Sequence, residues 1–230
     1  MAGNKFTSWL LSSKVTSLPR NLMLKAFRKR NLVVVRYDFP ERAKVMKLIT
    51  QMLLGYHEAY QIFSTVKKTA KIKGDMAEVG VYLGGSAKII SEAKKDKELH
   101  LFDTFEGLPE LSGKDDSTLF HKGKYNSSCE QVKNYLKKYQ GLHFYKGLFP
   151  ETATPIKNRK FSFVHLDVDL YEPTLECLKF FYPRMNKGGV IISHDYVNSP
   201  GVRKAFDEFF EKKQEPIIEL SGLQCMIVKV

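Results

Sequence analysis

The residues best placed to do chemistry lie in two acidic segments in the second half of the chain. One segment, at 165–172, carries Asp167 directly after an apolar run, and the other, at 193–196, carries His194 and Asp195 after a later run. If the two runs are neighbouring parallel strands, Asp167 and Asp195 meet at one edge of a sheet. Adjacent carboxylates repel unless a cation or a proton lies between them, and their oxygens suit Mg²⁺ (or Mn²⁺). The pattern predicts a divalent metal site; helix capping, or pairing with Arg and Lys, is the open alternative.

A glycine-rich segment earlier in the chain has the residue types of a ligand-binding turn. Gly80 allows a tight turn, and Gly84 and Gly85 let a ligand approach the backbone. Ser86 can cap the helix that follows, whose free N–H groups attract an anion such as a carboxylate. Because Tyr82 stands where the dinucleotide fingerprint has glycine, the pattern disfavours NAD.

Asp103 ends the next apolar run and is placed to accept hydrogen bonds from both hydroxyls of a ribose. A solvated loop aspartate is the alternative interpretation. The chain has no GxxxxGK[ST] motif, so phosphate binding of the nucleotide-hydrolase type is not expected. An adenosine ligand with a carboxylate and no phosphates fits better, and S-adenosylmethionine is such a ligand.

The elements that must position these residues alternate between strand and helix patterns after Gly74. Such alternation predicts a parallel sheet covered by helices, an α/β fold. A helix is expected from Glu41 to about Lys68, and the loop Thr104–Asn126 has the composition of a binding loop or lid. Strands are expected at 76–81, 99–102, 142–145, 161–166 and 190–193, helices at 86–94, 131–138, 174–182 and 202–212, and a closing hairpin at 216–220 and 224–230.

Composition indicates a globular domain with a basic N-terminal arm. The 230 residues carry a net charge of +12, and residues 1–37 hold eight basic side chains with no acid before Asp38. Residues 38–230 hold 29 basic against 25 acidic residues, a net charge of +4. The three cysteines form no CxxC pair, which excludes a zinc finger or disulfide scaffold and favours a reduced, cytoplasmic setting. No apolar run approaches the roughly 18 residues of a membrane span.

We therefore expect two parts, a helical basic arm at 1–40 and a main domain at 41–230. The arm either packs on the domain or on a second subunit of a homo-oligomer, or contacts an anionic membrane surface or lipid-linked substrate, or is a cleaved transit peptide. Because the excess charge lies in the arm and not over the domain, no nucleic-acid partner is expected. A peripheral position at a membrane stays open beside the cytoplasmic one.

Six motifs occur in the chain in an order that resembles the sequences of the macrocin O-methyltransferase family. Members of this family are S-adenosylmethionine-dependent sugar O-methyltransferases. The motifs lie at 74–82, 102–109, 147–152, 166–174, 188–189 and 194–196. The resemblance covers roughly residues 42–230. It implies a Rossmann-like methyltransferase fold, with a seven-stranded, mostly parallel sheet whose last strand is antiparallel.

The resemblance also implies the residues of the site. The metal ligands are expected to be Asp167, Asp195 and His194, and the catalytic residues Asp167, as general base, and His194. The family usually has Asp-Asp where this chain has His194-Asp195, so Asp169 is an alternative ligand, and His194 can be a ligand, a base or structural. The cofactor-binding residues are expected to be Glu78, Gly80, Tyr82, Gly84, Ser86, Asp103, Thr104 and Phe105.

The predicted function is O-methylation of a hydroxyl of a sugar or other vicinal-diol acceptor, a small molecule or a glycan, with metal assistance. Two alternatives use the basic arm: a nucleic-acid methyltransferase and a non-catalytic binder. The first is disfavoured because the chain has no Asn/Asp-Pro-Pro-aromatic tetrad to hold a flipped base.

Overall fold

The computed structural model describes residues 40–49 and 52–230 of the chain, which divides into units of residues 1–43 and 44–230. The predicted arm at 1–40 lies almost wholly outside the described residues. The helices are α3 (Pro40–Leu48), α4 (Tyr56–Thr69), α5 (Gly85–Ala93), α6 (Cys129–Leu136), α7 (Tyr171–Phe181) and α8 (Pro200–Phe210), with 3-10 turns η1 (Glu151–Ile156) and η2 (Tyr182–Arg184). The strands are β1 (Asp75–Val79), β2 (Leu99–Asp103), β3 (Leu142–Lys146), β4 (Phe161–Leu166), β5 (Met185–Ser193), β6 (Ile218–Glu219) and β7 (Cys225–Val228).

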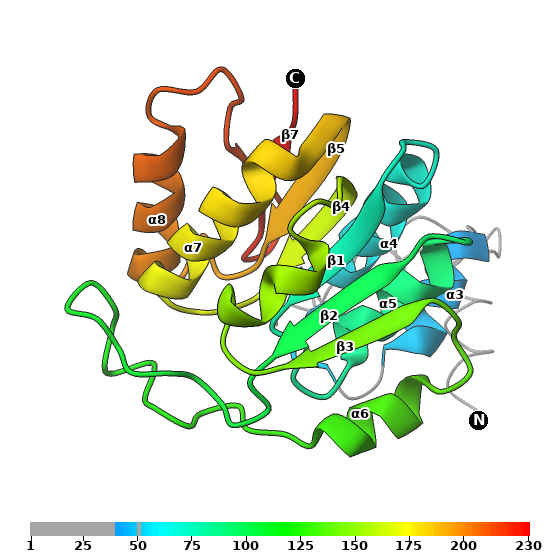
Figure 1. The fold of residues 1–230 in the computed structure, drawn as a ribbon, viewed down its shortest axis with the longest axis horizontal. Helices are drawn as coiled ribbons and strands as arrows, with labels where there is room; N and C mark the ends of the chain where they lie inside the picture. The colour runs from blue at the N-terminus through cyan, green and yellow to red at the C-terminus, as the bar shows by residue number, and fades with distance from the viewer. Residues whose placement is uncertain (1–39, 50–51) are drawn as a thin grey trace, which may run out of the picture. The chain divides into compact units, whose positions relative to one another are not determined.

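The seven strands form one sheet in the order β3-β2-β1-β4-β5-β7-β6 (Figure 1). Strands β1 to β5 are parallel to one another, and β7 is antiparallel to both β5 and β6. This topology confirms the predicted Rossmann-like fold with its antiparallel last strand. The order reverses between β1 and β4, and ligands of open parallel sheets bind beyond such a reversal, at the carboxyl ends of the strands.

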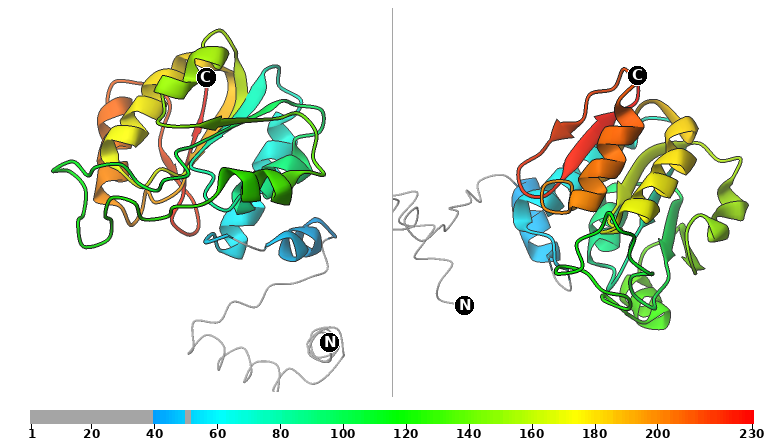
Figure 2. Two further views of the ribbon diagram at one scale, coloured as in Figure 1. Left: turned by 60° about the horizontal axis from the view of Figure 1, so that its bottom comes forward. Right: turned by 90° about the vertical axis from the view of Figure 1, so that its left-hand side faces the viewer.

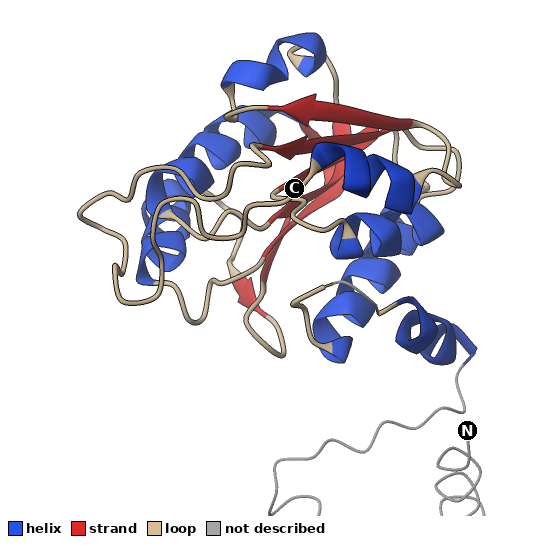
Figure 3. Ribbon diagram, turned by 90° about the horizontal axis from the view of Figure 1, so that it is seen from below, coloured by secondary structure: helices blue, strands red, loops and turns tan. Residues whose placement is uncertain are grey.

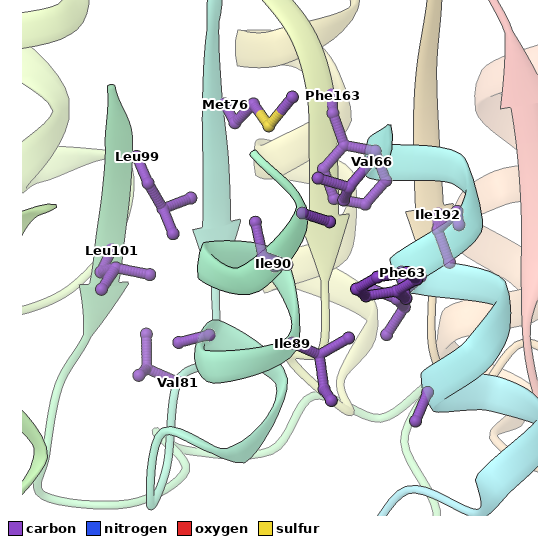
Figure 4. Packing of buried hydrophobic residues seen from close by; sticks show 14 of the residues in the cluster. Phe63, Val66, Met76, Val81, Ile89, Ile90, Leu99, Leu101, Phe163 and Ile192 are labelled. Atoms are coloured by element: carbon purple, nitrogen blue, oxygen red, sulfur yellow. The ribbon is translucent and has the colours of Figure 1, made fainter. Parts of the chain in front are cut away.

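Helices cover both faces of the sheet (Figure 3). On one face α4 and α5 pack through Phe63, Val66, Ile89 and Ile90 against the central strands (Figure 4). On the other face α7 and α8 lie side by side (Figure 2). Strands buried on both faces are mostly apolar, and β4 is buried at every position, with Ser162 and His165 as its two polar residues.

The single helix predicted from Glu41 to about Lys68 is wrong. Two helices, α3 and α4, occupy this region, and residues 52–55 between them have no regular secondary structure. Gly55 is the extended N-cap of α4, and the Glu58 carboxylate accepts a hydrogen bond from its backbone N–H (2.7 Å). The sequence pattern does not show the break between α3 and α4. Both helices pack on the same core, so apolar residues recur at helical spacing on both sides of it.

The carboxyl ends of the central strands are tied together by backbone contacts. Gly80 donates its N–H to the carbonyl of Phe102 on β2, and Asp167 donates to Val79 on β1, both at 2.9 Å. Gly80 has φ +88°, and a Cβ there would lie 1.8 Å from the backbone oxygen of Asp167. Only glycine permits this approach, which holds the turn after β1 directly against the residue after β4.

None of the helices in the described ranges is both long enough and apolar enough to cross a bilayer.

Candidate functional site

A cleft of about 380 Å³ lies at the carboxyl edge of the sheet. The segments that follow β1, β2, β4 and β5 all contribute to its wall, as the sequence predicts. Of the predicted site residues, those that line the cleft are Gly80, Tyr82, Ser86, Asp103, Thr104, Asp167, His194 and Asp195. Glu78, Gly84 and Phe105 do not line it: Gly84 is the N-cap of α5, Phe105 is buried, and Glu78 is fully buried in β1.

The Asp103 carboxylate holds the glycine turn in place. Its Oδ2 atom accepts hydrogen bonds from the backbone N–H groups of Val81 (2.7 Å) and Tyr82 (2.8 Å). Its Oδ1 atom accepts one from Phe105 (2.6 Å). An ionised carboxylate offers about four lone-pair sites, so three of them are engaged within the protein. The sequence predicts that Asp103 binds a ligand. The structure shows that its carboxylate also holds the backbone of the glycine turn.

We expect Asp103→Ala to weaken binding of S-adenosylmethionine by about tenfold or more, since one hydrogen bond to a charged group contributes roughly 1.5–3 kcal/mol. The loss includes the turn's anchoring as well as any direct contact. Calorimetric titration measures it, with Asp96→Ala, an exposed aspartate on the loop before β2, as the matched control. An unchanged dissociation constant for Asp103→Ala would contradict the role.

Glu78 pairs with a histidine that sequence reasoning did not single out. His165 Nδ1 lies 2.8 Å from Glu78 Oε1, and both side chains are fully buried, on the adjacent strands β4 and β1. Burial raises the pKa of the Glu78 carboxyl, and the neighbouring His165 opposes that rise. Glu78 and His165 lie two residues before Gly80 and Asp167, beneath the cleft, and neither lines it.

Asp167, His194 and Asp195 converge on one point at the cleft wall. His194 Nδ1 lies 2.9 Å from Asp195 Oδ2 and 3.4 Å from Asp167 Oδ1. Burial opposes protonation of this imidazole, yet the carboxylates of Asp167, Asp195 and Glu58 raise the pKa of His194 above its usual value. The predicted meeting of Asp167 with Asp195 is thus seen in the structure, with His194 between them.

Asp169 is a third aspartate beside this cluster. Burial, together with the nearby carboxylates of Asp167 and Asp195, raises the pKa of Asp169 well above its usual range. It is not one of the three residues whose ligand atoms come together, so the structure gives no support to Asp169 as the alternative ligand.

The cluster has the donor set and the spacing of a metal site. One ligand atom each from Asp167, His194 and Asp195 lies within 4.8 Å of the other two. Ligands at right angles on a cation, bound at about 2.1 Å, are about 3 Å apart, close to the separations from His194 Nδ1. These residues therefore fit a divalent cation, and the imidazole makes the donor set less purely oxygen than Mg²⁺ prefers.

Backbone strain is concentrated around the cleft. Four of its lining residues other than glycine have positive φ: Tyr82 (49°), Tyr125 (64°), Asp169 (62°) and Asp195 (60°). Each such conformation costs about 1–3 kcal/mol and persists where the surroundings fix it, which is most common at functional sites.

The long segment between β2 and α6 has no helix or strand and runs past the carboxyl edge of the sheet, as a lid would (Figure 1). Its two limbs pair through backbone hydrogen bonds, Leu108 N–H to Lys124 O and Gly123 N–H to Leu108 O. It is held to α7 by Asp115, whose Oδ1 accepts from the backbone N–H of Tyr171 at 2.7 Å.

We expect Asp115→Ala to release this segment. The variant loses the bond to Tyr171, worth roughly 1.5 kcal/mol, and the two bonds that Asp115 Oδ2 accepts from Ser112, which should speed amide exchange at residues 108–124 by about tenfold or more. Hydrogen exchange read by mass spectrometry measures the change. Asp116→Ala is the matched control, because Asp116 bonds only within the loop, to Thr118. Equal protection from exchange in both variants would contradict the role of Asp115 in holding this segment to α7.

Sequence reasoning missed Glu58, His165 and Asp115. Glu58 approaches the site from α4, with Oε1 3.6 Å from His194 Nε2. Its position three residues after a glycine is a capping signal, but the expected continuous helix concealed it.

The chain is similar in sequence to known O-methyltransferases. The family model described as Macrocin-O-methyltransferase (TylF) matches residues 13–225. A tetracenomycin-C 4'-O-methyltransferase of Streptomyces olivaceus, which acts on the 8-demethyl-8-(2,3-dimethoxy-alpha-L-rhamnosyl) form, is 29% identical over 66% of this chain and 64% of that relative. Demethyldecarbamoylnovobiocin O-methyltransferase of Streptomyces niveus is 26% identical over 61% of this chain and 60% of its own. The chain thus matches less than two thirds of the length of either relative.

Solved structures show the same fold. The O-methyltransferase NovP superposes with a TM-score of 0.69 at 22% identity, covering 79% of this chain and 83% of NovP. An O-methyltransferase from Bacillus cereus in complex with SAH superposes with a TM-score of 0.57 at 13% identity, covering 85% and 94% of the two chains. At these identities the likeness establishes the fold alone.

Proposed function

We propose, since the chain belongs to the macrocin O-methyltransferase family, that it transfers a methyl group from S-adenosylmethionine to a hydroxyl of a sugar or another vicinal-diol acceptor. The observation that carries the proposal is the shared cleft. The glycine turn with Asp103 and the cluster of Asp167, His194 and Asp195 line the same cavity of about 380 Å³, which lies at the reversal of strand order. Methyl donor and acceptor hydroxyl can meet there.

The donor would lie along the turn after β1 and the amino end of α5. Gly85 and Ser86 line the cleft at the first turn of that helix, and free N–H groups there favour the carboxylate of the methionine part. Since Asp103 has about one of its four lone-pair sites left, it would accept one ribose hydroxyl rather than both. This is narrower than the expectation drawn from sequence.

Asp167 is the group we assign to remove the acceptor's proton. Its side chain is 26% exposed, whereas that of His194 is 10% exposed. Both ring nitrogens of His194 face carboxylates, Nδ1 toward Asp167 and Asp195 and Nε2 toward Glu58, so neither is directed at an acceptor. Asp167 takes the proton while the hydroxyl oxygen attacks the methyl carbon and the sulfonium sulfur leaves with the bonding pair.

Asp167, His194 and Asp195 would hold a divalent cation, which when bound supplies a lowered pKa for an acceptor hydroxyl. The lid would exclude water from the donor. Tyr125 in the lid contacts the ring of Tyr82 in the glycine turn, with ring centroids 5.7 Å apart, so the lid and the donor turn close on each other.

A nucleic-acid substrate is not favoured. Lys124 is the only lysine or arginine among the residues that the structure describes as lining the cleft, and polyanion binding needs many cationic contacts. A cytoplasmic setting, homo-oligomer formation and membrane contact through residues 1–37 stay predictions from the sequence.

The full chain, titrated with S-adenosylmethionine in a calorimeter and then incubated with radiolabelled donor and a panel of glycosides with vicinal hydroxyls, tests the proposal. We expect binding of the donor and label on at least one glycoside hydroxyl, with NAD giving no heat. Binding of NAD, or a failure to bind S-adenosylmethionine, would contradict the proposed cofactor. Label recovered on a nitrogen or carbon atom instead of a hydroxyl oxygen would contradict the proposed reaction.

A further inference from the structure

Glu58 is a buried carboxylate whose environment is fixed from two directions. Its Oε2 accepts from the backbone N–H of Gly55 (2.7 Å), at the start of α4. Its Oε1 accepts from the backbone N–H of Leu223 (2.8 Å), in the turn before β7. The residue is 7% exposed. These bonds come from two distant parts of the chain, so the position of the carboxylate does not depend on the metal cluster.

The turn before β7 is shaped around this carboxylate. Gly222 has φ +100°, and a Cβ there would lie 2.5 Å from Glu58 Oε1. Glycine is therefore needed at this position both for its backbone conformation and for the room it leaves. The carboxylate lies against the backbone of the turn, with one oxygen also directed at His194.

His194 lies between Glu58 and the two aspartates. Its Nε2 atom is 3.6 Å from Glu58 Oε1, a few tenths of an ångström beyond ordinary hydrogen-bond length. Its Nδ1 atom faces Asp167 and Asp195. In a neutral imidazole one nitrogen is the donor and the other carries a lone pair. A cation bound at Nδ1 in place of a proton leaves the remaining ring proton on Nε2, where it is directed at Glu58 Oε1.

We propose that Glu58 is a positioning residue that holds His194 as an Nδ1 metal ligand, and that this ligand makes the site prefer a first-row transition dication over Mg²⁺. The inference rests on the proposed function for the identity of the cluster as a metal site. A carboxylate that orients a ligating histidine commonly contributes 10–100-fold to metal affinity. An imidazole among the ligands favours transition dications, whereas Mg²⁺ favours oxygen alone.

Mn²⁺ binding to the full chain, followed by the loss of the free-ion electron paramagnetic resonance signal, tests the proposal without donor or acceptor. We expect the wild type to bind Mn²⁺ more tightly than Mg²⁺ in a competition titration. Glu58→Gln should weaken Mn²⁺ binding by about 10–100-fold. His194→Asp should remove the preference for Mn²⁺ over Mg²⁺. Wild-type Mn²⁺ affinity in Glu58→Gln would overturn the proposal.

A double-variant cycle separates positioning from a structural role. If Glu58 acts through His194, adding Glu58→Gln to His194→Asp should leave Mn²⁺ affinity nearly unchanged. Equal losses in both backgrounds would show that Glu58 acts on the fold and would overturn the proposal. Thermal unfolding of each variant measures any loss of stability from weakened bonds to Gly55 and Leu223, apart from the change in metal affinity.

A second measurement needs no variant. In the Zn²⁺-loaded wild type, a long-range proton–nitrogen NMR spectrum should show His194 with its proton on Nε2 and the metal on Nδ1. A proton on Nδ1, or an imidazole unaffected by the metal, would overturn the assignment. Since neither measurement involves methyl transfer, their failure is distinct from a failure of the proposed activity.

Discussion

Replacing Asp167 by asparagine is expected to lower kcat for methyl transfer by about 10²–10⁴-fold, the usual contribution of a positioned base. The amide keeps the shape of the side chain but cannot take a proton, and it is a weaker ligand for a cation. Binding of S-adenosylmethionine should be nearly intact, because the donor is assigned to the turn after β1 and to Asp103. Single-turnover transfer of labelled methyl, together with calorimetry, measures the two effects separately.

The control for Asp167→Asn is Asp96→Asn, the same chemical change at an exposed position that does not line the cleft. It should leave both transfer and donor binding at wild-type values. Wild-type transfer by Asp167→Asn in the presence of a metal chelator would contradict both the base and the metal roles assigned to this residue.

Replacing Gly80 by alanine is expected to destabilise the domain by roughly 2–6 kcal/mol. A residue with a side chain at φ +88° costs about 1–3 kcal/mol, and overpacking typically adds 1–3 kcal/mol. Relief of the clash must move either the glycine turn or the Asp167 backbone, so donor binding should also fall. Urea unfolding gives the free energy of unfolding, and calorimetry gives the donor affinity.

Two other glycines separate the causes. Gly123 has φ +79° with nothing within 4 Å of a built Cβ, so its alanine variant carries conformational strain without a clash. Gly113 has neither the unusual φ nor a neighbour within 4 Å, and its alanine variant should be nearly neutral. Equal stability of the Gly80 and Gly113 variants would show that the close contact between the turn and Asp167 is absent in solution.

The sequence predicts the sheet well because its strands are short apolar runs bounded by turn residues. One rule predicts Asp103, Asp167 and Asp195 as site residues: side chains that follow parallel strands meet at one edge of the sheet. The rule needs only the positions of strand ends, which glycine and acidic residues mark clearly. It therefore predicts which residues gather, and in this chain it brings together residues up to 115 positions apart in sequence, from Gly80 to Asp195.

The rule does not predict which groups donate hydrogen bonds to each carboxylate. Asp103 was expected to face a ligand, but three backbone N–H groups already use it. The sequence does not indicate Glu58 and His165, because their roles depend on contacts across the fold. Glu58 bonds the turn before β7, and His165 bonds Glu78 on a neighbouring strand. Asp115 lies in a loop without periodicity, where no local pattern gives a partner. Contacts of this kind are set by packing, which local spacing does not encode.

The close approach of Gly80 to the backbone oxygen of Asp167 fixes the distance between the glycine turn that would bind the donor and the proposed base. Only main-chain atoms set this distance. The lid meets the glycine turn through side chains, such as the ring of Tyr125 against that of Tyr82, so lid residues can change without altering this distance. Substitution of lid residues that line the cleft, such as Leu119 and Phe120, should therefore change which acceptor fits while the transfer step is retained. Specificity and reactivity are in that sense separately engineerable in this scaffold.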